Sequence, residues 1–177
     1  MTLHANMNAS DIEERFEQIA KMLFESFAIQ KGETMYLFKE IEFYFYNKNH
    51  RDIITYPRSS KPLCWYNNRF GGIDLNFESN IECRESKKYD LDDTAYFGGI
   101  LIRQLVCVNE VGNVKVLCGP LKCAELFKHN DTTSSSNEPH LVKYDNGIVG
   151  YIRRPRINIL QPKQMVKDKV NSILNNY

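Results

Sequence analysis

Two glutamates lie inside a strongly aromatic stretch of the chain, and their spacing is the first feature that could support chemistry. The stretch is YLFKEIEFYFYNKNH, residues 36–50. Side chains alternate along a β-strand, so we expect Glu40, Glu42 and Tyr44 on one face and the apolar residues at odd positions on the other. A carboxylate among aromatic rings is poorly solvated, which suits it to general acid or base catalysis. A strand with one face open to water shows the same pattern, so the strand alone leaves both explanations open.

Other residues of catalytic or binding type follow in a linear order. His50 is the last residue of the stretch, Arg58 lies in the loop that follows, and Asp74 and Arg103 lie on two later predicted strands. A metal site has little support, because the five cysteines include no CxxC pair and the four histidines do not cluster with them. Neither of the two GGI sequences extends to GxGxxG. We therefore expect no metal and no cofactor.

These residues need a scaffold, and the composition predicts one globular domain, residues 1–177, with 42% hydrophobic and 25% charged residues. The net charge of +1 gives no basic signal for the whole chain. Residues 141–177 are locally basic and form a candidate phosphate surface, although a solvated basic face is the simpler explanation of such a run. An odd number of cysteines, no apolar leader and no apolar run of membrane-spanning length favour a cytoplasmic protein with no membrane partner.

The sequence predicts a mixture of strands and helices to position these candidate residues. A capping box, SDIE at residues 10–13, precedes helical spacing to about residue 28. Strand patterns cover residues 36–46, 73–77, 95–108 and 114–118, a helix is expected from Pro120, and residues 162–177 read as a closing helix. Residues 147–160 read as one or two strands, while residues 1–10 and 129–139 are expected to be flexible. We predict an α+β fold: a single domain with a curved, mainly antiparallel β core flanked by N- and C-terminal helices.

Several motifs, in this order, resemble those of the alkyladenine (3-methyladenine or methylpurine) DNA glycosylase family, the type with an antiparallel β core. The chain has KEIEFYFYNKNH where the family has V-E-x-E-A-Y followed by a His, and YPR at residues 56–58 where the family has T-P-R. IDL, GILIRQL and GPLKCAELF resemble the family's M-N-I, V-L-L-R-A-L-E-P and G-P-x-x-L-x-x-A-L segments. The resemblance covers residues 36–127 in collinear order.

The resemblance implies a role for each of the candidate residues named above. Glu42 would be the general base, orienting a water that attacks the sugar carbon of a nucleotide flipped out of the duplex. Tyr44 and His50 would be walls of the base pocket, although the interval between them is shorter than in the family. Asp74 stands where the family has a pocket Asn, which removes an amide donor. Tyr66 is the nearest candidate for the aromatic wedge that replaces the flipped base, with Trp65 and Phe70 as substitutes.

The implied partner is duplex DNA that contains a damaged purine, and duplex binding requires several phosphates to be neutralised. The candidate phosphate-binding residues are Arg58, Arg103, Arg153, Arg154 and Arg156. Glu40 is expected to have only a supporting role.

Three functions remain open on the sequence. The first is a base-excision glycosylase that hydrolyses the N-glycosidic bond of alkylated or otherwise damaged purines. The second is a protein of the same fold that binds nucleic acid or a modified nucleotide without cleaving it. The third is an unrelated β-rich interaction module whose short motifs match by accident. The first two require Glu42, His50, Asp74 and Arg103 to converge on one concave site, whereas the third leaves them scattered.

Overall fold

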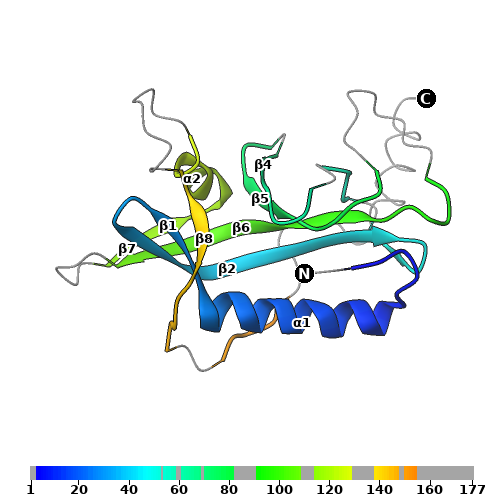
Figure 1. Cartoon of the computed structure of the whole chain (residues 1–177), viewed down its shortest axis with the longest axis horizontal. Helices are drawn as coiled ribbons and strands as arrows, with labels where there is room; N and C mark the ends of the chain where they lie inside the picture. Colours follow the sequence, from blue (N-terminus) through cyan, green and yellow to red (C-terminus); the bar gives the residue numbers. More distant parts are fainter. Residues whose placement is uncertain are drawn as a thin grey trace, which may run out of the picture.

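A long helix lies along one side of a curled antiparallel sheet (Figure 1). The computed structural model describes residues 3–52, 54–58, 61–68, 70–81, 91–108, 114–128, 138–147 and 150–154. Its two helices are α1 (Ala9–Ser26) and α2 (Pro120–Glu125). The strands are β1 (Phe27–Lys31), β2 (Thr34–Asn47), β3 (His50–Arg51), β4 (Trp65–Asn67), β5 (Ile73–Asn76), β6 (Phe97–Val108), β7 (Val114–Cys118) and β8 (His140–Lys143). The α+β fold with a curved antiparallel core confirms the prediction.

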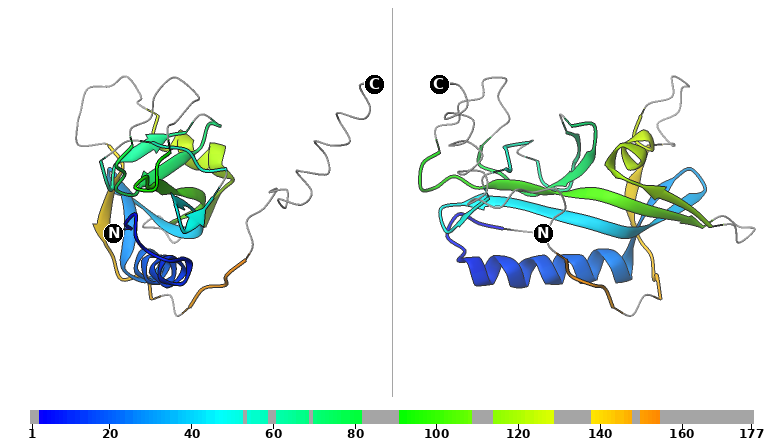
Figure 2. Two further views of the ribbon diagram at one scale, coloured as in Figure 1. Left: turned by 90° about the vertical axis from the view of Figure 1, so that its right-hand side faces the viewer. Right: turned by 180° about the vertical axis from the view of Figure 1, so that it is seen from behind.

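The two longest strands form the centre of the sheet. The strand order is β4-β5-β6-β2-β1-β8, with β3 paired to β2 and β7 paired to β6. All the pairs are antiparallel, and β2 runs against β6 from the pair Met35–Val108 to the pair Tyr46–Phe97. The views in Figure 2 show how the sheet curls above α1.

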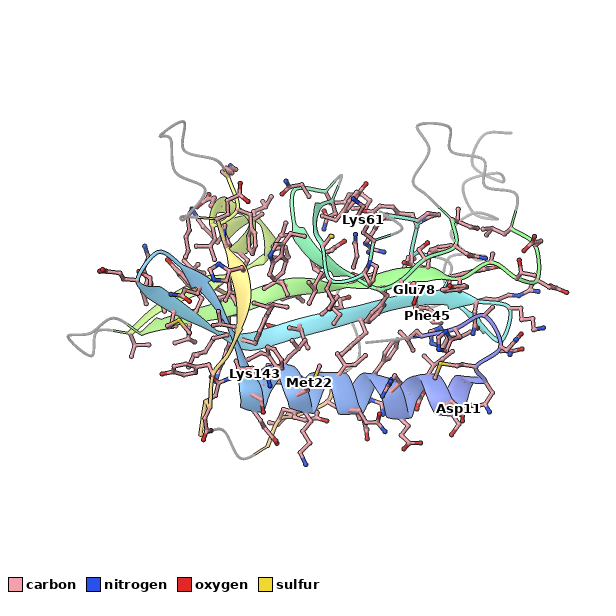
Figure 3. All side chains as sticks on the ribbon, viewed as in Figure 1. Asp11, Met22, Phe45, Lys61, Glu78 and Lys143 are labelled. Atoms are coloured by element: carbon pink, nitrogen blue, oxygen red, sulfur yellow. The ribbon has the colours of Figure 1, made fainter. Side chains whose placement is uncertain are left out.

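Helix α1 begins two residues earlier than its capping box predicts. The side chain of Asn8 accepts a hydrogen bond from the Asp11 amide at 2.9 Å, so Asn8 is the N-cap and Ser10 lies inside the first turn. The apolar spacing of the helix buries Ile12, Ile19 and Leu23 against the sheet. Side chains fill the space between β2 and α1, and Phe45 of β2 is labelled there (Figure 3).

The alternation along β2 is as predicted. Phe43, at an odd position, stacks on Phe16 of α1 with ring centroids 4.5 Å apart, and Phe45 contacts Phe77 in the same core. The odd positions therefore face α1, and the even positions, Glu42 and Tyr44 among them, face the other side. The pairing with β6 is irregular only between Phe38 and Ile41.

The N-terminal segment differs from the prediction of flexibility. Leu3 is fully buried in the hydrophobic core, and the Asn47 side-chain amide donates to the carbonyls of His4 and Met7. Residues 3–8 are thus packed against the end of β2. Residues 129–137, the end of the predicted 147–160 strand region and the predicted closing helix lie outside the described residues, while residues 150–154 are not a strand. Neither described helix has the length and apolar character that crossing a membrane requires.

Candidate functional site

The sheet brings Glu42 and Asp74 into one row across its three central strands. Glu42 of β2 pairs with Leu101 of β6, and Leu101 pairs with Asp74 of β5. Asp74 pairs in turn with Tyr66 of β4. Directly paired residues project from the same face of a sheet, so all four side chains lie on the face opposite α1. This face, with Glu42 and Asp74 in one row, is the candidate site.

Glu42 is held in place by two hydrogen bonds although it is only 6% exposed. Its Oε1 accepts from the Tyr44 hydroxyl at 2.8 Å, and its Oε2 accepts from Arg103 Nη1 at 2.7 Å. A carboxylate offers about four lone-pair positions, so each oxygen can still accept a further hydrogen bond. The arrangement fixes the direction of the carboxylate and leaves a lone pair on each oxygen.

Arg103 lies between the two glutamates of β2. Its Nε is 3.4 Å from Glu40 Oε1, while its Nη1 bonds Glu42. Burial alone lowers the pKa of the guanidinium, but the hydrogen bond and negative charge of Glu42, with a smaller effect of Glu40, raise the pKa of Arg103 overall. The Arg103 carbonyl accepts from the Gly119 amide at 2.9 Å, which ties this part of β6 to the start of α2. Its side chain is 21% exposed, so this cation remains accessible from solvent.

Asp74 has a different arginine as its partner. The carboxylate is fully buried, and its Oδ2 lies 2.6 Å from Arg58 Nε. Its Oδ1 accepts from the Asn68 side-chain amide at 3.1 Å. Arg58 Nη1 donates to Thr55 Oγ1 and to the Tyr56 carbonyl, both at 3.1 Å. These contacts of Arg58 hold the loop before β4 over the candidate site.

Arg58, a predicted phosphate-binding residue, is buried in this structure and not open to a phosphate group. Arg58 is 3% exposed, and its guanidinium carbon lies 4.7 Å from the Tyr56 ring centroid and 5.6 Å from that of Tyr44. A fully buried carboxylate requires a cation beside it, and Asp74 draws the loop arginine inward instead of leaving it at the surface.

His50 does not join the candidate site. It pairs with Asn47, an odd position of β2, and therefore faces α1. Its Nδ1 lies 2.9 Å from the Phe45 carbonyl, and its ring meets Phe16 at 6.1 Å. The Asn47 side chain accepts a hydrogen bond from the His50 amide at 2.7 Å. This bond closes the short turn between β2 and β3, which holds His50 on the face of Asn47 and away from that of Glu42. The structure thus does not bring His50 together with Glu42, contrary to the expected position of His50 at the same pocket.

The basic residues after β8 lie on the wrong side for the same site. Arg153 forms ion pairs with Glu13 and Glu17 of α1 at 3.3 and 3.2 Å. Figure 1 shows this segment beside α1. Glu42 lies on the opposite face of the sheet, because its neighbour Phe43 is the residue that stacks on α1. Arg154 is exposed, and Arg156 lies outside the described residues. Of the predicted phosphate-binding residues, Arg58 and Arg103 lie at the candidate site, and of these two Arg103 is the one partly exposed to solvent.

The three candidate wedge residues occupy different surroundings. Tyr66 is half-buried beside Asp74. Trp65 contacts Phe127 with ring centroids 4.6 Å apart and donates from Nε1 to the Pro139 carbonyl, so it belongs to the packed interior. Phe70 is 73% exposed on a turn after β4, where the Asn68 side chain accepts from the Phe70 amide at 3.0 Å.

Sequence patterns do not indicate the roles of Asn68 and Asn76 or the burial of Arg58. Asn76 pairs with Gly99, which pairs with Tyr44, so its side chain lies in the row next to that of Glu42. The one signal for Arg58 is indirect, because an Asp on a buried strand needs a cationic partner. Over the described ranges, no three His, Cys, Asp or Glu side chains gather as a metal site requires.

The chain was compared with family models, curated proteins and solved structures, and none of the three comparisons found a match.

Proposed function

We propose that the protein is a DNA glycosylase that removes damaged purines from duplex DNA, with Glu42 as its general base. The observation that carries the proposal is the buried Glu42 carboxylate, held by Tyr44 and Arg103 in one row with Asp74. The motif resemblance selects these four residues from the sequence independently of their position in space. His50, which the sequence also predicts to converge on this site, faces α1 instead and has no part in the proposal.

The chemistry follows from the position of the carboxylate. A water bound to Glu42 attacks the sugar carbon of the flipped nucleotide. The water oxygen forms the new bond to that carbon, and the bond from carbon to the base nitrogen breaks with its electron pair leaving on the base. Glu42 accepts the proton that the water loses. Its negative charge also stabilises the cationic sugar that develops as the base departs.

Tyr44 and Arg103 support this reaction from either side. The Tyr44 ring supplies an aromatic surface for the flipped base, while its hydroxyl orients Glu42. Arg103 combines a bond to Glu42 with an accessible guanidinium, so it can hold a phosphate that flanks the flipped nucleotide.

A second candidate function is binding of a modified nucleotide without cleavage. It is favoured by one observation: both oxygens of Glu42 already accept a hydrogen bond while the residue is 6% exposed. In such a protein the same face binds the base, and Glu42 serves only to hold Arg103.

Glycosylase assays separate the two functions. Duplex oligonucleotides with hypoxanthine, ethenoadenine or a methylated purine are incubated with the protein, and released base and abasic sites are measured. We expect base release by the wild type and a loss of about 10²–10⁴-fold in rate for Glu42→Gln, which keeps the shape but not the charge. Glu40→Gln is the matched control, because Glu40 also lies close to Arg103, at 3.4 Å, but is not the carboxylate proposed to bind the water.

The expected control result is a much smaller loss of rate. If the wild type binds damaged duplex and releases no base from any of these substrates, the binding function replaces the catalytic one. If Glu42→Gln is as active as the wild type, Glu42 is not the general base.

A further inference from the structure

Strand β7 forms an edge of the sheet with no strand on its outer side. It pairs with β6 along its whole length, and no other strand of the described residues pairs with it. Figure 1 shows β7 at one end of the sheet, past the end of α1. The edges at β4 and β8 differ, because Trp65 of β4 donates to the Pro139 carbonyl just before β8. An open edge presents backbone N–H and C=O groups to which a further strand can bond.

The backbone groups of alternate residues of β7 point away from β6. The Gly119 amide, directly after β7, donates to the Arg103 carbonyl of β6 at 2.9 Å. Peptide groups along an antiparallel strand point in turn to one side and to the other, so those of Lys115 and Leu117 also face β6. The remaining residues of β7 therefore have their N–H and C=O groups on the outer side: Val114, Val116 and Cys118.

The outward-facing residues also carry exposed apolar side chains. Val114 is 64% exposed and Val116 is 50% exposed, although both lie in a regular strand. Val116 pairs with Val106, which pairs with Leu37, so an apolar row continues from the edge across the sheet. Lys115 is the one charged residue of β7 and lies on its other face. An apolar edge strand with a single charge favours association with another strand.

The sequence of β7 is complementary to itself in one antiparallel register. With a two-fold axis at Val116, this residue lies opposite its own copy, and Val114 lies opposite Cys118 of the second copy. The outward N–H and C=O groups of both strands then bond to each other. Lys115 lies opposite Leu117, so no like charges meet. With the axis at Lys115 the two lysines would lie opposite each other, and with the axis at Leu117 the outward groups of Val114 would have no partner in β7.

We propose that the protein forms a two-fold symmetric dimer in which the β7 strands of two copies pair about Val116. The sheet of one copy continues into that of the other, and the two apolar rows that start at Val116 become one stripe across the interface. A second copy suits this edge because one register bonds all its outward groups and keeps the lysines apart, and two-fold dimers are the commonest symmetric assemblies. The proposal does not depend on the glycosylase function.

The mass of the protein in solution tests the association. We expect sedimentation equilibrium to give twice the mass of one chain for the wild type, with dissociation on dilution. Val116→Lys should raise the dissociation constant by about tenfold, because it places like charges opposite each other at the axis and removes the apolar contact. Ile152→Lys is the matched control, since it makes the same change at a side chain that is 84% exposed but lies outside β7. It should leave the dissociation constant unchanged.

Disulfide formation tests the register. The two Cys118 residues of the proposed dimer are roughly 13 Å apart along the strands, which is too far for a disulfide. Val114→Cys places a thiol opposite Cys118 of the other chain, with about 5.5 Å between the Cα atoms of a hydrogen-bonded pair, which is within disulfide range. We expect oxidation of Val114→Cys to link two chains through residues 114 and 118, identified by mass spectrometry. Val114→Cys combined with Cys118→Ser should form no such link.

Either measurement can overturn the dimer. A single-chain mass of the wild type at every concentration overturns it and leaves the β7 edge to a strand of another protein. Equal effects of Val116→Lys and Ile152→Lys, or a disulfide between two Cys118 residues in the wild type, overturn the pairing about Val116. If Val116→Lys does not fold, the disulfide decides, and failure of Val114→Cys to link through Cys118 overturns the proposal.

Discussion

Two buried ion pairs stand side by side on the face opposite α1, and they differ in their access to solvent. Glu42 bonds an arginine that is 21% exposed, whereas Asp74 bonds one that is 3% exposed. A charge that reaches solvent can neutralise a phosphate, and a closed pair contributes to stability or to selectivity. The difference explains why we assign DNA contact to Arg103 and not to Arg58.

Arg103→Ala should weaken binding to damaged duplex DNA and reduce the slope of log K against log salt by about 1, because one phosphate contact is lost. Fluorescence anisotropy at several salt concentrations measures both quantities. Arg153→Ala is the matched control, since Arg153 pairs with Glu13 and Glu17 of α1 and should leave the slope unchanged. An unchanged slope in Arg103→Ala would contradict the phosphate role.

Asp74→Asn restores the residue that the resembling family has at this position, but it leaves the Arg58 charge buried without its carboxylate. We expect a loss of about 3–5 kcal/mol in the free energy of unfolding, because breaking one side of a buried ion pair strands the other. Urea denaturation measures the change. Lys122→Ala, which breaks the exposed Lys122–Glu125 pair, should cost about 0–1 kcal/mol. Similar losses in both variants would show that the buried pair is not a stabilising unit.

The sequence predicts some of these residues well and others not at all. Alternation along β2 is a local property, so the order of residues is enough to place Glu42 and Tyr44 on one face. The directions of Arg58 and His50 depend on loop paths. His50 is turned toward α1 by a two-residue turn that the Asn47 side chain closes, and Arg58 is drawn inward by Asp74, sixteen residues later in the chain. Contacts of this kind have no signature in a single sequence.

At the scale of elements, the start of α1 shows how a correct element can have a wrong boundary. The SDIE pattern identifies a helix, and the helix exists. A capping side chain closer to the N-terminus starts the helix earlier: Asn8 caps the Asp11 amide, and the Ile12 amide, which Ser10 would otherwise be able to cap, bonds the Asn8 carbonyl instead. The N-terminal residues are then held by β2, which a terminal position in the sequence does not reveal.

Asn8→Ala should therefore lower the free energy of unfolding by about 0.5–2 kcal/mol, the usual cost of removing an N-cap. Chemical denaturation followed by circular dichroism measures the loss. Ser10→Ala is the matched control, and because alanine is a better helix former than serine inside a helix, it should be neutral or slightly stabilising. A larger loss for Ser10→Ala than for Asn8→Ala would restore the capping box as the start of the helix.

At the scale of the whole molecule, the curl of the sheet brings its two edges together. β4 and β8 are the outermost strands in the sheet order, yet Trp65 of β4 donates to the carbonyl of Pro139, just before β8. Trp65 is the only tryptophan of the chain, so its fluorescence reports on this closure. Cys123 of α2 is buried in the same hydrophobic core as residues of α1, such as Ile12. Both helices and both edges of the sheet thus share one core.

This shared core leads us to expect one cooperative unfolding transition. Burial raises the pKa of the Cys123 thiol to about 11, so at pH 8 only about a thousandth of it is the reactive thiolate while the protein is folded. Unfolding returns the pKa of the thiol to its ordinary range and exposes the side chain.

Labelling of Cys123 at pH 8, identified by mass spectrometry of its peptide, should follow the same urea midpoint as Trp65 fluorescence and the helical circular dichroism signal. Exposed Cys118 should react before any unfolding and serves as the internal control. If Cys123 becomes reactive at lower urea than the loss of the α1 signal, α2 and the edge of the sheet open as a separate unit, because a single core cannot release one side while the other stays folded.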